Sequence, residues 1–105
     1  MADDILERVR EAANKRLLFL PHTIPQMSRP DRMISTAEIE RVVATGEIIE
    51  DYPEDARGHS CLMFGLGRDD RAIHVVCAPK DEYLAIITAY LPDPDQWTSD
   101  FRGRL

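Results

Sequence analysis

Apolar residues follow a helical spacing in the first part of the chain and alternate with polar residues in the second part. Near the start they recur three or four positions apart, at Ile5, Val9, Ala12 and Ala13. Asp3 or Asp4 can cap such a helix, because a short carboxylate accepts hydrogen bonds from the N–H groups of the first turn. The pattern predicts an N-terminal helix within residues 1–20.

Prolines interrupt the segment that follows. Leu17–Leu20 is a short apolar run closed by Pro21, and it fits either a last helical turn or a short strand. Pro25 and Pro30 make residues 21–32 a poor regular helix, although one helical turn can begin at Pro25.

A second helix has clear boundary signals. Ser35 and Glu38 form the S-x-x-E pattern of a capping box, in which each residue's side chain bonds to the other's backbone N–H. The apolar stripe of this helix lies at Ile39, Val42 and Val43. Gly46 is expected to end the helix in a left-handed conformation.

After Gly46 the apolar period changes to two, which is typical of half-buried strands. Strands are predicted over Ile48–Tyr52, Cys61–Leu66, Ala72–Ala78 and Tyr83–Leu91. Their short connections indicate antiparallel hairpins, because parallel neighbours need long crossovers. The predicted fold is α+β: N-terminal helices followed by a four-stranded antiparallel meander, with the helices on one sheet face. Trp97 is expected to fold back over an edge or a face of the sheet.

Composition narrows the class of protein but names no activity. A length of 105 residues suits one domain, 1–105. No apolar run approaches the ~20 residues of a membrane span, and the acidic start lacks the basic region of a signal peptide. Two cysteines make no disulfide scaffold, so the reducing cytoplasm is the expected compartment. The oligomeric state stays open, and a homo-oligomer is compatible with this composition.

The net charge of −6 is unevenly distributed. Glu47–Gly58 holds five acidic side chains and one arginine. An acidic surface repels nucleic-acid backbones, which bind clustered lysine and arginine. The segment is interpreted either as a solvated strand edge and loop or as an acidic surface for a basic partner.

Several blocks occur in the order found in a known family: Gly46–Pro53, Ser60–Leu62, Arg71–Val76, Ile87–Pro94 and Trp97. Ahead of them, five residues match the family's opening His-Ala-x-x-Arg-Met and Arg-Gly-Ile-Ser elements, namely His22, Met27, Arg32, Ile34 and Ser35. The chain therefore resembles the small bacterial family called domain of unknown function 4258. The family-like core is 21–97 and the tail 98–105. Gln26 replaces the family's arginine and Met33 its glycine.

That family is thought to be similar to the RelE/ParE-like toxins. The resemblance implies a RelE-like fold and a metal-independent endoribonuclease that acts on RNA without a cofactor. It also implies a cognate antitoxin of the small zinc-finger or helix-turn-helix kind as the partner.

Metal-independent RNA cleavage needs a base for the 2′-hydroxyl, an acid for the leaving oxygen and positive charge for the phosphate. The candidate catalytic residues are His74, His22, Tyr90 and Arg32, and the candidate substrate-binding residues are Arg71 and Thr88. His74 is the main acid/base candidate because imidazole titrates near neutral pH. His22 is a second proton-transfer group in a loop-like segment, Tyr90 orients the substrate, and Arg32 binds the phosphate.

Each candidate also has an ordinary structural explanation, such as a strand histidine satisfied by one hydrogen bond or an exposed solubilising arginine. Thr88 and Tyr90 share a strand face. An odd loop before the last strand places His74 opposite Thr88, and an even loop places it opposite Ile87 on the other face. The sequence leaves this register open.

A zinc site would draw on His59, Cys61, His74 and Cys77, but the last two have opposite parity along one strand, so no metal is expected. Both cysteines are interpreted as buried small apolar residues. The alternative function is a noncatalytic interaction module on the same scaffold, with the acidic Glu47–Gly58 segment meeting a basic partner.

Overall fold

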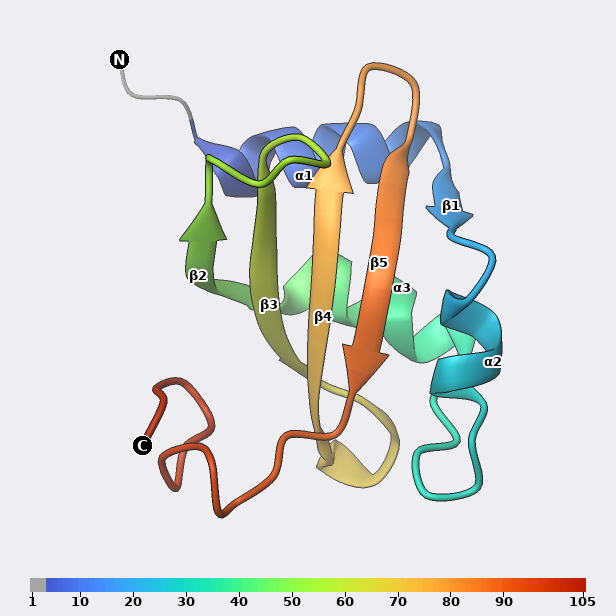
Figure 1. Ribbon diagram of the computed structural model, residues 1–105. Coiled ribbons are helices and arrows are strands. Elements are labelled where there is room, and N and C mark those ends of the chain that lie inside the picture. Colours follow the sequence, from blue (N-terminus) through green and yellow to red (C-terminus); the bar gives the residue numbers. More distant parts are fainter. Residues whose placement is uncertain (1–3) are drawn as a thin grey trace.

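The computed structural model describes residues 4–105. Its elements are α1 (Ile5–Lys15), β1 (Leu17–Phe19), α2 (Thr23–Met27), α3 (Thr36–Thr45), β2 (Glu47–Tyr52), β3 (Ser60–Leu66), the 3-10 helix η1 (Arg68–Asp70), β4 (Ala72–Pro79) and β5 (Leu84–Tyr90). Figure 1 shows α1 and α3 behind the sheet, with the C-terminal residues at its lower end. Among the described helices none combines the length and the apolar character that a membrane crossing requires.

The strands form one open five-stranded sheet in the order β1-β5-β4-β3-β2. From β2 to β5 each strand runs antiparallel to the next. The predicted total of four strands is wrong, because Leu17–Phe19 adds a parallel edge strand beside Leu84–Ile86. Three residues are too few to show a period, so their pairing depends on a distant segment. The α+β class is confirmed.

The two longer helices begin at predicted caps. Asp4 accepts hydrogen bonds from the backbone N–H groups of Leu6 at 3.0 Å and Glu7 at 3.4 Å. Asp3, the other predicted cap, lies outside the described residues. At α3 the Ser35–Glu38 capping box is present in both directions, at 3.2 Å and 3.0 Å.

Gly46 ends α3 in an extended conformation, with φ −81° and ψ −172°, so the predicted left-handed cap is wrong. A glycine is required here by space rather than by backbone angle. A Cβ at this position would lie 2.5 Å from the carbonyl oxygens of Phe64 and Val42. The close approach lets the chain pass directly from α3 into β2 alongside β3.

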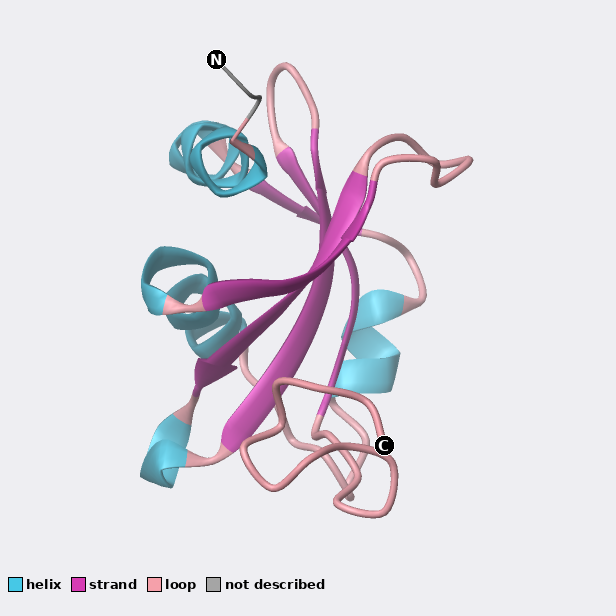
Figure 2. Ribbon diagram, turned by 90° about the vertical axis from the view of Figure 1, so that its left-hand side faces the viewer, coloured by secondary structure: helices cyan, strands magenta, loops and turns pink. Residues whose placement is uncertain are grey.

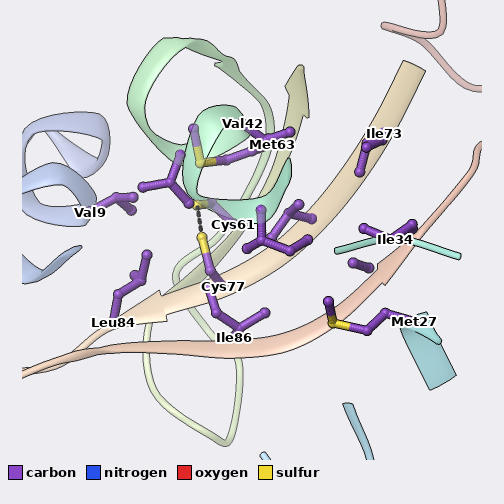
Figure 3. Packing of buried hydrophobic residues seen from close by; sticks show 14 of the residues in the cluster. Val9, Met27, Ile34, Val42, Cys61, Met63, Ile73, Cys77, Leu84 and Ile86 are labelled. Carbon is purple, nitrogen blue, oxygen red and sulfur yellow. Dashed lines mark hydrogen bonds between the residues drawn. The ribbon is translucent and has the colours of Figure 1, made fainter. Parts of the chain in front are cut away.

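The main core lies between the sheet and the pair α1 and α3, which cover one of its faces (Figures 2 and 3). Its fully buried members include Val9, Ile39, Val42, Met63, Val75 and Ile86. These are the helical stripes and the inward-facing strand positions that the apolar spacing predicts. This core supports the sheet from one face, and the opposite face is not covered by α1 or α3.

Cys61 and Cys77 face each other across β3 and β4 in this core as free thiols, with their sulfurs 3.9 Å apart. The contact with Cys61, together with burial, raises the pKa of the Cys77 thiol well above its usual value. Because both side chains are fully buried, we expect neither thiol to react with an aromatic disulfide reagent in the folded protein. Absorbance should show reaction only at the rate of unfolding, and full reaction in denaturant. A fast-reacting thiol in native buffer would contradict this packing.

The free edge of β5 beyond β1 is covered by α2 and the residues after it. The hydroxyl of Thr23 lies 3.1 Å from the carbonyl of Ile86 and 2.8 Å from that of Ile87. Arg32 donates to the carbonyl of Ala89 at 3.2 Å. These contacts block the edge against pairing with another chain.

Candidate functional site

The candidate site lies on the sheet face opposite α1 and α3, where the C-terminal residues cross the strands (Figure 2). Alternation along β4 turns His74 to this face, and its side chain is 0% exposed. Three aromatic rings surround it, with centroid distances of 4.4 Å to Trp97, 5.3 Å to Tyr90 and 6.1 Å to Phe64. The prediction that Trp97 folds back over the sheet is confirmed, and it forms one wall of the site.

His74 and Tyr90 stand directly opposite each other in β4 and β5. Neither register considered from the sequence is correct. Val76 pairs with Thr88 but Cys77 pairs with Ile86, so Ile87 is an extra residue that shifts the register by one. This bulge places Tyr90 beside His74.

Both nitrogens of His74 are hydrogen-bonded. Nε2 lies 2.9 Å from the backbone carbonyl oxygen of Phe101, and Nδ1 lies 3.2 Å from the hydroxyl of Tyr90. A carbonyl only accepts, so Nε2 carries the proton and the Tyr90 hydroxyl donates to Nδ1 in the neutral imidazole. Burial lowers the pKa of His74, and the Phe101 carbonyl and the charge of Glu50 offset only part of that effect. The ring is thus a neutral base whose one lone pair faces Tyr90.

Residues 98–105, the C-terminal segment, are attached to this face through two arginines. The Arg102 guanidinium pairs with Glu47 and lies 4.6 Å from the Phe64 ring centroid. The Arg104 guanidinium pairs with Glu50 at 2.7 Å and lies 4.6 Å from the Trp97 ring centroid. The bond from Arg104 lowers the pKa of Glu50, so this carboxylate stays charged.

Phe101 holds its carbonyl on His74 through an uncommon backbone conformation. Its φ is +62°, in the left-handed region that a non-glycine residue rarely adopts. Such a conformation persists where surrounding contacts hold it, and here Arg102 and His74 fix the two sides of the turn. The C-terminal segment therefore packs against the site in a defined conformation.

A small open pocket of about 270 Å³ adjoins the aromatic cluster. Its lining includes Arg32, Tyr90 and Arg104, together with Trp97, Gln96, Leu91, Asp31 and Asp93. Two guanidinium groups and a phenol hydroxyl are donors that suit a phosphate, although two aspartates balance the formal charge. This pocket brings together three groups: Arg32, Tyr90 and, through its hydrogen bond to Tyr90, His74.

The other candidate residues lie elsewhere. His22 is exposed at the start of α2, and its side chain makes no capping bond there. Thr88 lies on the same face of β5 as Tyr90, and its hydroxyl contacts the Gln26 side chain at 3.3 Å. Neither residue lines the pocket beside Tyr90.

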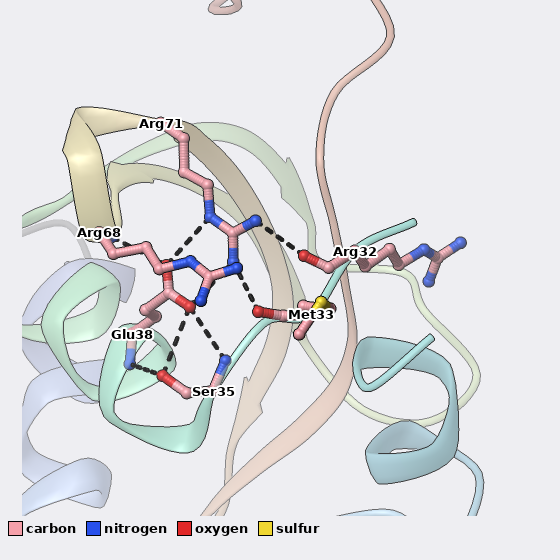
Figure 4. A network of polar contacts seen from close by, with 6 residues as sticks. All are labelled: Arg32, Met33, Ser35, Glu38, Arg68 and Arg71. Carbon is pink, nitrogen blue, oxygen red and sulfur yellow. Dashed lines mark hydrogen bonds and ion pairs between the residues drawn. The ribbon is translucent and has the colours of Figure 1, made fainter. Parts of the chain in front are cut away.

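Arg71 is committed to a polar network around Glu38 (Figure 4). Its guanidinium pairs with Glu38 at 3.0 Å and donates to the backbone carbonyls of Arg32 and Met33 at 2.7 Å each. Figure 4 shows the side chain of Arg32 extending away from Arg71. In this arrangement Arg71 joins α3 to the segment before it, which is a structural position rather than an open phosphate-binding one.

The carboxylate of Glu38 is strongly stabilised in its charged form. Burial raises its pKa, but the hydrogen bond from Arg71, those from the backbone N–H groups of Ser35 and Arg68, and the positive charge of Arg71 outweigh it and lower the pKa to about 2. The side chain is only 8% exposed. Glu38 is therefore both a member of the capping box of α3 and the acidic partner of an internal ion pair.

The acidic segment is partly neutralised within the chain. Three of its carboxylates pair with arginines: Glu47 with Arg102, Glu50 with Arg104, and Asp55 with Arg57. Asp51 instead accepts a hydrogen bond from His59. His59 also accepts a hydrogen bond from Arg8 at 3.1 Å, and the cysteines lie in the core on the other face. Within residues 4–105 no cluster of three or more His, Cys, Asp or Glu side chains is placed to hold a metal ion.

Sequence reasoning missed the C-terminal segment. The sequence signal for this segment is weak. Arg102 and Arg104 are two positions apart, which is the spacing of successive residues on one face of a strand, and they follow Trp97 closely. Nothing in the local pattern says that these residues cross the sheet to reach Glu47 and Glu50. That placement depends on a return of the chain that only the fold provides.

The fold and the site define an α+β domain with an open five-stranded sheet, in which a buried histidine and a half-buried tyrosine pair beneath a basic C-terminal segment. The family model of a domain of unknown function, DUF4258, matches residues 19–91, and the chain belongs to this family. No curated protein and no solved structure matches the chain.

Proposed function

We propose that this protein is a toxin-like, metal-independent endoribonuclease of a toxin–antitoxin pair, of the RelE/ParE-like kind that its sequence resembles. The observation that carries the proposal is the 3.2 Å contact between His74 and Tyr90 at the wall of a pocket that Arg32 and Arg104 also line. Proton transfer and phosphate binding are the two requirements of this reaction, and the pocket joins groups suited to both.

In the proposed reaction Arg32 binds the scissile phosphate and neutralises part of the charge that develops on it. The Tyr90 oxygen accepts the proton of the attacking 2′-hydroxyl while the Tyr90 proton passes to Nδ1 of His74. The negative charge of Glu50 in β2 stabilises the imidazolium that forms. The 2′-oxygen bonds to phosphorus, which gives a 2′,3′-cyclic phosphate, and the bond from phosphorus to the 5′-oxygen of the following nucleotide breaks. That leaving oxygen takes a proton from solvent, and the imidazolium returns its proton to solvent. His22 has no role in this scheme, because it does not line the pocket.

The test is cleavage of structured and single-stranded RNA by the purified protein in the presence of EDTA. We expect Tyr90→Phe to reduce cleavage by roughly 100-fold or more, since it removes only the hydroxyl of the proton relay. Tyr83→Phe is the matched control, because it makes the same change at a tyrosine outside the pocket, and it should cleave at the wild-type rate. His74→Gln is preferable to His74→Ala, since His74 fills a buried space between rings. Equal rates for Tyr90→Phe and the wild type would remove this pair from the mechanism.

The second candidate function is a noncatalytic interaction module on the same scaffold. It is favoured by the complete burial of His74 and by the way the acidic strand β2 already binds two arginines of the C-terminal segment. In this case the basic partner, such as an antitoxin, would compete for Glu47 and Glu50. A well-folded protein that cleaves no RNA in any of these variants would favour the module.

A further inference from the structure

We propose that residues 98–105 form a strap that closes the His74–Tyr90 site, and that the site acts on a ligand only after the strap has lifted. This inference rests on the proposed function, because it describes how the same site is regulated. It is carried by three kinds of contact between the strap and the site: a hydrogen bond, two ion pairs and two stacked guanidinium groups.

The strap blocks the site at His74 itself. The Phe101 carbonyl occupies Nε2, and no part of the imidazole is exposed. The charged and titratable groups beside the ring are Glu50 of β2, Tyr90 of β5 and Arg104 of the strap. While the strap is seated, His74 exchanges protons only through Tyr90, and Arg104 is held by Glu50 rather than by a ligand.

The two arginines that attach the strap lie at the surface of the protein. The side chains of Arg102 and Arg104 are 46% and 61% exposed, and Leu105 is 77% exposed. Exposed ion pairs contribute little and are screened by salt, whereas the core on the other sheet face is apolar and fully buried. Lifting residues 98–105 therefore breaks these pairs, the hydrogen bond between Phe101 and His74, and the backbone bridge between Trp97 and Arg104, and it leaves the sheet and its helices intact.

The Glu47–Arg102 pair is the best place for a test substitution, because neither residue lines the pocket beside Tyr90. Glu47→Lys replaces an attraction by a repulsion and should release the strap. The charge swap Glu47→Lys with Arg102→Glu restores the pair and should seat it again. Glu54→Lys is the matched control: it makes the same charge change in the same acidic segment, at an exposed residue that is not among the strap's contacts.

The first readout is acylation of individual histidines by diethyl pyrocarbonate, followed by mass spectrometry, with exposed His22 as an internal reference. We expect His74 to be protected in the wild type and its reaction to rise about five- to tenfold in Glu47→Lys. Protection should return in the charge swap and persist in Glu54→Lys. High salt should also raise His74 acylation in the wild type. Unchanged protection of His74 in a folded Glu47→Lys variant would overturn the strap.

RNA cleavage by the same four proteins separates the strap from the ribonuclease. If His74 opens and cleavage rises with it, both proposals are supported. If His74 opens in Glu47→Lys but no protein cleaves RNA, the closure stands and the ribonuclease function is overturned. If all four proteins cleave at one rate, the ribonuclease stands and regulation by the strap is overturned.

Discussion

Replacing Glu38 by alanine is expected to reduce the free energy of unfolding by about 3 kcal/mol or more. The change removes the capping box of α3 and leaves the guanidinium of Arg71 without its carboxylate in a site that is mostly buried. It also frees the backbone N–H of Arg68, which donates to Glu38 at 2.8 Å. One carboxylate holds three segments together, so its loss affects all of them.

The pH dependence of this effect has a defined sign. The pKa of Glu38 falls from 4.5 to about 2 on folding, so the folded state favours the charged carboxylate. The stabilisation is complete above pH 4.5 and is lost as the pH falls towards 2. A shift of this size corresponds to about 3 kcal/mol. Because the variant lacks this group, its stability should decline less steeply than that of the wild type between these pH values.

Urea unfolding at pH 7 and at several lower pH values measures both quantities. Glu40→Ala is the control, since it removes an exposed carboxylate from the same helix and should change stability by about 0.5 kcal/mol or less. A Glu38→Ala variant as stable as Glu40→Ala would show that the network in Figure 4 contributes little.

Trp97→Ala is expected to cost about 3–5 kcal/mol, as for other large aromatic residues in well-packed sites. Trp97 is 4% exposed, and its ring contacts both the His74 ring and the guanidinium of Arg104. Its loss opens a cavity over β4 and removes the fixed end from which the strap extends. We expect the melting temperature to fall by roughly 10–20 °C.

Thermal unfolding followed by circular dichroism measures this effect. Trp97→Phe keeps a ring against His74 and should lose much less stability than Trp97→Ala. A loss below about 1 kcal/mol in Trp97→Ala would contradict the close packing of Trp97 against the sheet.

Local signals predicted much of the fold. Ser35 and Glu38 lie three positions apart, so their capping box is visible in the sequence and is present in the structure. The sequence leaves β1 open between a helical turn and a strand, because Leu17–Phe19 becomes a strand only by pairing with residues near the other end of the chain. The left-handed conformation expected for Gly46 is wrong, since the sequence does not show the carbonyl of Phe64 that excludes a side chain there.

The candidate site was predicted less completely. Residue type identifies His74 and Tyr90 as candidates, but their pairing depends on the extra residue Ile87, which no sequence pattern indicates. The position of Arg71 illustrates the same limit, because its partners come from α3 and from the segment before it. Residue type indicates what a side chain can do, and only the fold determines which side chains meet.

The parallel pairing of β1 with β5 bears on the order in which the molecule folds. The hairpins from β2 to β5 close short loops, but β1 must find a strand more than half the chain away. Closing so long a loop costs conformational entropy before any contact repays it, and such pairings slow folding. We therefore expect the antiparallel strands to assemble first, and β1, with α1 directly before it, to dock afterwards. Amide exchange in β1 should then be faster than in β4 at the centre of the sheet.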